Sequence, residues 1–152
     1  MTASKHIAIV GAGMAAITCA RTLVQAGHQV TVFEKSHTVG GRMATRNSPF
    51  GTFDTGAQYF TVRDPRFMEA IQTTAAVCKR WSANTVQVLD AHGRVAAAGL
   101  PAREPHWVAS PGMSALVRKW AQPLVAAQCL ELNTQVTHLE RDSLNKDQWQ
   151  VR

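Results

Sequence analysis

The sequence predicts an α/β fold built around parallel strands, and three observations near the N-terminus support this. A short apolar run at residues 7–10 ends at a glycine and is too short to be a helix. Residues 14–26 then carry apolar side chains at helical spacing, with Gly27 placed to end that helix. Residues 29–34 return to strand character. A strand, a tight turn, a helix and a second strand within ~30 residues form a βαβ unit.

The rest of the chain predicts shorter elements of both kinds. Residues 35–53 are rich in glycine and polar residues and predict a loop, and residues 53–62 predict extended chain. Asp64 and Pro65 are typical of a helix start and predict a helix from 65 to about 79. Further expected elements are a hairpin over 84–98, a short strand at 106–108, a helix from 111 to about 121 that Pro123 ends, a strand over 130–140 and a final strand from 149 with no partner after it.

Composition excludes several classes of protein. The chain has 152 residues, 45% of them hydrophobic, which is enough for a folded core. No apolar run reaches the roughly 18 residues of a membrane helix, so we expect a cytoplasmic protein that contacts no membrane. Three cysteines without C-x-x-C spacing indicate neither a disulfide framework nor a metal site. The net charge is +6, and the only local cluster of basic residues is Lys35, Arg42 and Arg46. This cluster fits a small anionic ligand, and we expect no nucleic-acid partner.

The main motif is a G-x-G-x-x-A pattern at residues 11–16, between the first strand and the helix. Gly11 allows the tight turn, Gly13 lets a pyrophosphate approach the backbone, and Ala16 allows the helix to pack closely on the sheet. The helix N-terminus adds N–H groups and the positive end of the helix dipole. Glu34, 21 residues after Gly13, is placed to accept hydrogen bonds from a ribose. The pattern predicts a Rossmann-like site for FAD or NAD and leaves these two cofactors open.

A second glycine-rich segment follows the βαβ unit. Gly40 and Gly41 allow the backbone to run against a ligand, and Arg42 can pair with a phosphate through two parallel hydrogen bonds. With the D-x-G-A-Q-Y stretch at residues 54–59, these segments resemble the renalase-like branch of the flavin amine-oxidase superfamily. The resemblance spans nearly all of the chain and departs at residues 37–38, where many relatives carry an arginine and this chain has His-Thr.

The resemblance implies an FAD-dependent oxidoreductase that holds its cofactor noncovalently. Its substrate would be a dihydronicotinamide dinucleotide isomer or an amine, which gives a hydride to the flavin, and oxygen is the expected acceptor. No catalytic residue follows from it. The cofactor-binding residues that it implies are Gly11, Gly13, Met14 and Ala15 at the pyrophosphate, Glu34 at the ribose, Lys35 at the adenosine end, Gly41 and Arg42 at a phosphate, Met43 near the ring, Gly56, Ala57 and Gln58 along the flavin, and Val136 at the adenine.

The same resemblance implies a divided domain organisation. Residues 1–60 would form the first segment of an FAD-binding domain, residues 61–110 part of an inserted α+β substrate domain, and residues 111–152 the return to the FAD-binding domain. Because renalase-like proteins are longer, we expect either the N-terminal portion of a larger enzyme or a short relative completed by another chain. Two alternatives remain, a non-catalytic FAD- or NAD-binding module or fragment, and an NAD-dependent dehydrogenase, which leaves the 40–42 and 54–59 segments unexplained.

Overall fold

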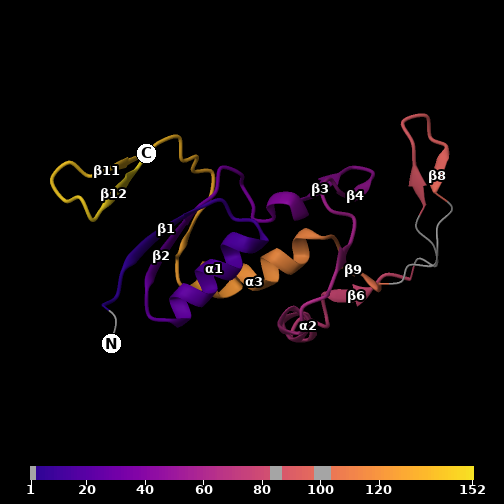
Figure 1. Ribbon diagram of the computed structural model, residues 1–152, viewed down its shortest axis with the longest axis horizontal. Helices are drawn as coiled ribbons and strands as arrows, with labels where there is room; N and C mark the ends of the chain where they lie inside the picture. Colours follow the sequence, from indigo (N-terminus) through magenta and orange to yellow (C-terminus); the bar gives the residue numbers. More distant parts are fainter. Residues whose placement is uncertain (1–2, 83–86, 98–103) are drawn as a thin grey trace.

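The computed structural model describes residues 3–82, 87–97 and 104–152 and confirms the α/β fold. Strand β1 (His6–Val10), helix α1 (Met14–Gln25) and strand β2 (Gln29–Phe33) follow the predicted βαβ order. Strand β2 lies between β1 and β10 (Leu130–Glu131), and both pairs are parallel. This arrangement is the strand order of one half of a Rossmann-like sheet, with α1 as the crossover helix (Figure 1).

The turn after β1 is tied to the end of β2. The Gly11 N–H donates to the Phe33 carbonyl over 2.7 Å, and the backbone at Gly11 has a φ of 92°, which favours glycine. The G-x-G segment therefore leaves the sheet at the carboxyl ends of its parallel strands, the edge where α/β proteins place their ligands.

Three helices share one core beside this sheet. Helix α3 (Ser114–Ala126) buries most of one face, packs against α1 and lies alongside it in Figure 1. Trp120 of α3 is 6% exposed, and its ring meets Phe67 of α2 (Pro65–Gln72) edge-on at 6.3 Å between centroids. The Arg21 guanidinium of α1 lies 5.8 Å from the centre of the same indole ring. Trp120 thus joins all three helices.

A second sheet is antiparallel and contains β5 (Phe60–Thr61), β9 (His106–Ala109) and β6 (Cys78–Arg80), in that order. Three two-stranded hairpins complete the described fold, and those of β7–β8 and β11–β12 stand at opposite ends of the molecule (Figure 1). The hairpin strands are β3 (Thr45–Ser48) with β4 (Gly51–Asp54), β7 (Val88–Leu89) with β8 (Val95–Ala97), and β11 (Leu139–Arg141) with β12 (Trp149–Val151). No helix within the described ranges is long and apolar enough to cross a bilayer.

The predicted loop over 35–53 is wrong in its second half. That region contains a short 3-10 helix, η1 (Gly41–Met43), and the β3–β4 hairpin. The extended chain predicted over 53–62 is also interrupted, because residues 55–59 form a bend. The bend arises where the Ala57 N–H donates to the Arg42 carbonyl over 2.8 Å, which draws the chain away from a straight path.

Three predicted helix bounds differ from the structure. Asp64 caps α2 as predicted, since its carboxylate accepts from the Arg66 N–H over 2.8 Å, but α2 ends at Gln72 rather than near 79. Residues 78–80 instead pair with β9, so tertiary pairing overrides the helical pattern. Helix α3 begins at Ser114 rather than 111 and continues through Pro123 to Ala126.

The predictions for the last quarter of the chain need two corrections. Only Leu130 and Glu131 of the predicted strand over 130–140 pair with β2, because Asn133 adopts a left-handed conformation that turns the chain. The strand from 149 does have a partner, β11, with which it forms an antiparallel hairpin.

The hairpin predicted over 84–98 is confirmed at β7, β8 and the turn between them, while residues 84–86 and 98 lie outside the described residues.

Candidate functional site

The largest of the three cavities described below opens where α1 begins, at the carboxyl edge of the parallel sheet. Its volume is about 980 Å³. Three segments form its wall: the end of β1 with the first turn of α1, the glycine doublet with η1, and the bend at 56–57. The lining residues are Val10, Gly11, Gly13, Met14, Ala15, Ala16, Gly40, Gly41, Arg42, Met43, Gly56 and Ala57.

The glycine doublet is held against the G-x-G turn by backbone contacts. The Gly40 N–H donates to the Ala12 carbonyl over 3.0 Å, and Gly13 and Gly40 form an isolated parallel bridge. A Cβ atom at Gly41 would lie 3.0 Å from the Gly13 Cα, and the Gly41 φ of 54° also favours glycine. The contact between the two glycine-rich segments therefore requires glycine at position 41.

The start of α1 is suited to an anion. No side chain of the described residues caps this helix, and its first turn contains no acidic residue. The first N–H groups of an α-helix have no partner within the helix, and they lie at the positive end of its dipole. Here Met14, Ala15 and Ala16 line the cavity. A phosphate in the cavity would accept hydrogen bonds from this turn.

Arg42 adds a positive charge to the same wall. Arg42 is one of the lining residues, and its guanidinium has no ion pair or hydrogen bond with the described part of the chain. The Arg42 carbonyl, by contrast, is fixed by the Ala57 N–H. An ideal Cβ at Gly56 would lie 2.8 Å from the Arg42 carbonyl carbon, so the two backbones pass in direct contact. The backbone of Arg42 is held while its side chain is available to a ligand.

Glu34 is buried at the end of β2, where its carboxylate holds two loops. One oxygen, Oε2, accepts from the Ala12 N–H over 2.7 Å, and Oε1 accepts from the Ser36 N–H over 2.8 Å. Burial by itself raises the pKa of Glu34, but the backbone hydrogen bonds from Ser36 and Ala12 outweigh it and hold that pKa below its usual value. Glu34 therefore fixes the shape of the G-x-G turn. Each oxygen keeps a further lone pair for a ligand.

A smaller cavity of about 290 Å³ adjoins the first one and shares Val10 and Gly11 with it. Glu34 lines this cavity on one side and the loop after β10 lines it on the other. The Thr134 N–H donates to the Glu34 carbonyl over 2.9 Å, which brings the loop to the end of β2. The full lining is Val10, Gly11, Phe33, Glu34, Lys35, Thr134, Gln135 and Val136.

The two cavities bring together nearly all of the predicted cofactor-binding residues. Gly11, Gly13, Met14, Ala15, Gly41, Arg42, Met43, Gly56 and Ala57 line the larger one, and Glu34, Lys35 and Val136 line the smaller one. Gln58 lines neither. Its side-chain amide folds back and donates to the Asp54 carbonyl over 2.7 Å, which stabilises the bend, and its role beside the flavin stays a prediction.

Several wall residues were missed by the sequence analysis. Thr134 and Gln135 line the smaller cavity beside the predicted Val136, and their position next to that residue was the only signal.

Asp54 has a structural role that its motif did not reveal. Its Oδ1 accepts from the Met113 N–H over 2.8 Å and from the Thr45 hydroxyl over 2.6 Å, so it ties β4 to the start of α3.

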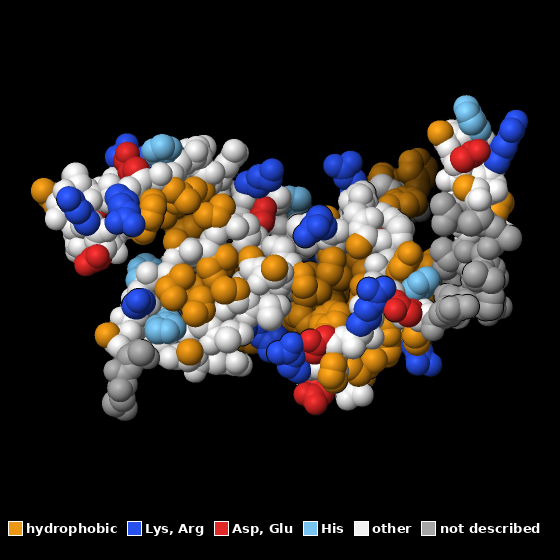
Figure 2. Space-filling view, in the orientation of Figure 1, with side chains coloured by type: hydrophobic (Ala, Val, Ile, Leu, Met, Phe, Trp, Pro, Cys, Tyr) orange, Lys and Arg blue, Asp and Glu red, His pale blue; other side chains and the backbone are white. Residues whose placement is uncertain are grey.

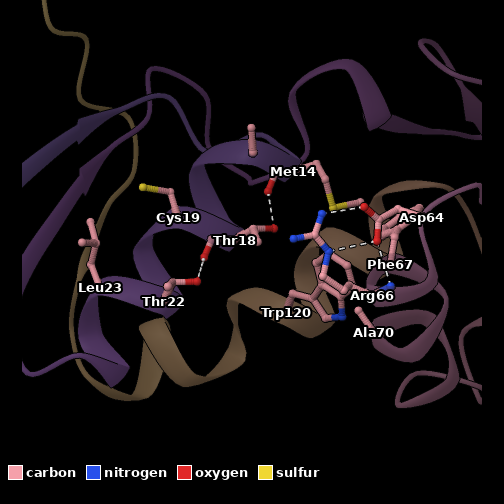
Figure 3. Close-up of a pocket in the computed structure, with 11 residues that line it drawn as sticks. Met14, Thr18, Cys19, Thr22, Leu23, Asp64, Arg66, Phe67, Ala70 and Trp120 are labelled. Carbon is pink, nitrogen blue, oxygen red and sulfur yellow. Dashed lines mark hydrogen bonds and ion pairs between the residues drawn. The ribbon is translucent and has the colours of Figure 1, made fainter.

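A third hollow, of about 650 Å³, lies on the outer side of α1, towards α2. Figure 3 shows Thr18, Cys19, Thr22 and Leu23 along α1, with Phe67, Ala70 and Trp120 among the residues on the facing side. The Thr18 and Thr22 hydroxyls donate to backbone carbonyls one turn earlier, so they offer their hydrogens to the helix. Figure 2 shows apolar side chains gathered over this central part of the molecule, with charged groups at their edge.

Metal chemistry has no visible basis in the described residues. Nowhere in residues 3–82, 87–97 and 104–152 do three His, Cys, Asp or Glu side chains gather into a group that could hold a metal ion. The cavities offer instead glycine backbone, helix N–H groups and one arginine, which together match the chemistry of a pyrophosphate.

Comparison with known proteins agrees with this geometry. Residues 9–74, less than half of the chain, match the family model described as an NAD(P)-binding Rossmann-like domain. Over 41 residues the chain is 61% identical to L-amino acid oxidase Cdc18 of Crotalus durissus cumanensis, which is 27% of this chain and 8% of that protein. Over 58 residues it is 47% identical to a 4,4'-diapophytoene desaturase of Staphylococcus haemolyticus, which is 38% of this chain and 12% of that protein. The matched segments thus span a small part of these curated relatives.

A solved structure extends the likeness in fold to most of the chain. The 2,6-dihydroxypyridine-3-hydroxylase from Arthrobacter nicotinovorans superposes on 99% of this chain and 33% of its own, with a TM-score of 0.58 and 16% sequence identity. At that identity the likeness concerns the fold alone. The chain has a mixed α/β fold with a Rossmann-like dinucleotide-binding unit, of which residues 9–74 match the NAD(P)-binding Rossmann-like family.

Proposed function

We propose that this protein binds FAD noncovalently and is an oxidoreductase of the flavin amine-oxidase type. The observation that carries the proposal is the wall of the larger cavity, where the uncapped start of α1, the two glycine segments and Arg42 converge. The sequence resemblance to that superfamily and the identity to an L-amino acid oxidase support it further.

The two adjoining cavities suit the two halves of such a cofactor. The pyrophosphate would lie against the first turn of α1 and Arg42, because both carry positive charge. The adenosine end would occupy the smaller cavity, between Glu34 and the 134–136 loop, where the remaining lone pairs of Glu34 can accept from ribose hydroxyls. The flavin would extend along Met43, Gly56 and Ala57. The lining of both cavities contains no His or Cys that could form a covalent link.

The cofactor, when bound, supplies the redox chemistry by accepting a hydride from the substrate. The contribution of this chain is placement. Glu34 accepts a hydrogen bond from the G-x-G turn, and the Arg42 carbonyl accepts one from the bend at 56–57. The close contact between Gly13 and Gly41 holds the two glycine segments together. From the resemblance alone, we further propose that the substrate is a dihydronicotinamide dinucleotide isomer or an amine. Oxygen is the proposed electron acceptor.

We also propose the domain division that the sequence predicts, and the pairing of the strands supports it. Residues 1–60 and 111–152 would form one cofactor-binding unit, since β10 pairs with β2 and the 134–136 loop meets Glu34. Residues 61–110 would belong to a substrate domain, in keeping with the separate antiparallel sheet of β5, β9 and β6.

Titration of the purified chain with FAD and with NAD tests the cofactor. We expect a yellow complex with FAD, and Arg42→Ala should weaken it roughly 10- to 100-fold, the value of a charge-assisted phosphate contact. Arg46→Ala is the matched control, because Arg46 lies four residues away on β3 and does not line the larger cavity. Preference for NAD, or equal effects of the two substitutions, would refute the proposed site.

Anaerobic mixing of the yellow complex with electron donors tests the reaction. Bleaching of the flavin by a dihydronicotinamide dinucleotide isomer or by an amine supports an oxidoreductase and identifies its donor class. A complex that binds FAD tightly but is bleached by neither class would refute the catalytic half of the proposal and indicate a binding module.

A further inference from the structure

Three aromatic rings from three different segments gather on one face of the small antiparallel sheet. Tyr59 precedes β5, His106 begins β9 and Trp81 follows β6. The ring centroids of Tyr59 and His106 are 4.1 Å apart, and those of Tyr59 and Trp81 are 5.8 Å apart with an angle of 24° between the planes. We call Tyr59, Trp81 and His106 the ring cluster.

The strand register explains why these rings share a face. The Trp81 N–H donates to the His106 carbonyl over 2.8 Å, and Thr61 pairs with His106 across the sheet. Side chains alternate between the two faces of a strand, so Tyr59 and Thr61 point the same way. Phe60 points the opposite way, into the core, where its ring meets Phe67 at 5.8 Å.

The two faces of the sheet therefore differ in what covers them. The Phe60 face packs on α2 and α3 through Phe67 and Trp120. On the other face, Tyr59 is 38% exposed and Trp81 is 39% exposed. Tyr59 is also the only tyrosine in the chain.

One member of the ring cluster, Tyr59, follows closely in sequence on a residue that lines the larger cavity. Ala57 lines that cavity, and two residues of chain can span at most about 7 Å, so the Tyr59 Cα lies within that distance of the Ala57 Cα. The bend between them is held by the Gln58 amide, which donates to the Asp54 and Gly56 carbonyls. The position of Tyr59 relative to the cavity is thus fixed by the bend.

We propose that the ring cluster binds a flat, unsaturated ring of the substrate by stacking. The inference rests on the proposed function, because it places this ring beside the end of the cavity assigned to the flavin. Aromatic faces attract flat rings through offset stacking, which adds to the gain from burying apolar area. A ring of this kind can belong to an aromatic amine or to a nicotinamide, and a saturated aliphatic chain gains less from the same faces.

Ligand-observed NMR on the full chain, with and without FAD, tests the ring cluster. The probes are benzylamine, cyclohexylmethylamine and nicotinamide. The first two carry the same charge and differ in whether the ring is flat. We expect benzylamine, nicotinamide or both to bind roughly 3- to 10-fold more tightly than cyclohexylmethylamine, as expected for a stacking contact. Binding of one alone identifies the source of the ring, and equal binding of all three probes would overturn the proposal.

Substitutions then locate the binding. Trp81→Leu and Tyr59→Leu should each weaken binding of the preferred probe by a similar factor, while Tyr59→Phe, which keeps the ring, should restore it. The matched control is Trp149→Leu, because Trp149 is likewise a partly exposed tryptophan but belongs to β12. If the control weakens binding as much as Trp81→Leu does, the ring cluster is not the site.

The same experiment separates the two proposals. Loss of FAD binding with intact ring selectivity refutes the proposed cofactor but leaves the ring cluster supported. Retention of FAD with no ring selectivity refutes the ring cluster alone. Circular dichroism of each variant establishes that the fold is intact, and the half-exposed positions of Tyr59 and Trp81 make large losses of stability unexpected.

Discussion

Gly56 gives the sharpest test of how the cavity wall is built. Its φ does not lie in the left-handed region, so backbone conformation alone does not require glycine there. The requirement is steric, because an added Cβ would lie 2.8 Å from the Arg42 carbonyl carbon and even closer to the carbonyl oxygen. Carbon atoms normally approach to about 3.5 Å, so the chains must separate by at least about 0.7 Å to relieve the contact with the carbon, and by more to relieve the one with the oxygen.

The cost of Gly56→Ala follows from this separation. Forcing a methyl group into a packed backbone contact costs about 1 to 3 kcal/mol. The hydrogen bond from the Ala57 N–H to the Arg42 carbonyl, 2.8 Å long, would stretch and lose about 1 kcal/mol. We therefore expect the free energy of unfolding to fall by about 2 to 4 kcal/mol. FAD affinity should fall as well, because Arg42 moves with its carbonyl.

Urea denaturation followed by circular dichroism measures this loss. The control is Gly93→Ala, where the added Cβ meets nothing within 4 Å and the only cost is the φ of 76°. That substitution should cost about 1 kcal/mol and leave FAD binding unchanged. A Gly56→Ala variant that is as stable as the Gly93→Ala variant would refute the steric explanation.

Three further substitutions test other contacts. Glu34→Gln should cost about 1 to 3 kcal/mol, because an amide nitrogen cannot accept from the Ala12 or Ser36 N–H. Folding lowers the pKa of Glu34, so the stabilisation by its carboxylate is present above the ordinary pKa of 4.5 and is lost as pH falls below it. The urea midpoint of the variant should therefore change less with pH in this range than that of the unsubstituted protein. Parallel curves of urea midpoint against pH would contradict the role of Glu34. Asp54→Ala should lower the free energy of unfolding by about 2 kcal/mol, whereas Asp54→Asn, which keeps Oδ1, should lose less, and equal losses would argue against that oxygen as the acceptor. Pro123→Ala should raise the same free energy by about 1 to 3 kcal/mol, because it restores an N–H inside α3, and a decrease would show that the proline has a favourable role.

The parts of the fold that were predicted correctly depend on local signals. The βαβ unit was predicted because its strands, its helix and the G-x-G turn between them have patterns that hold within ~30 residues. Asp64 was identified as a cap because the cap and the N–H group that donates to it, that of Arg66, lie within three residues. Twelve of the thirteen predicted site residues line the two cavities, and their role in cofactor binding stays a prediction.

The errors arose where distant segments decide the structure. Residues 78–80 have a helical pattern, but they pair with β9 and form a strand of the antiparallel sheet. The bend at residues 55–59, where the Gln58 amide donates to the Asp54 carbonyl, was not predicted because no local pattern indicates it. Pro123 remains within α3 because its neighbours Ala121 and Leu124 are buried in the shared core, and this burial outweighs one missing hydrogen bond.

The pairing of β10 with β2 has a consequence for how the protein assembles. Val32 and Leu130 are neighbours in the sheet, although about 100 residues of chain separate them. At a synthesis rate of about 5–20 residues per second, roughly 5 to 20 seconds pass between the synthesis of β2 and that of β10. During that interval one edge of β2 is open and the smaller cavity lacks its 134–136 wall. A ribosome-bound chain that stops before residue 130 should therefore already contain the wall of the larger cavity, proposed for the pyrophosphate, while the smaller cavity, proposed for the adenosine, forms only after β10 has paired with β2.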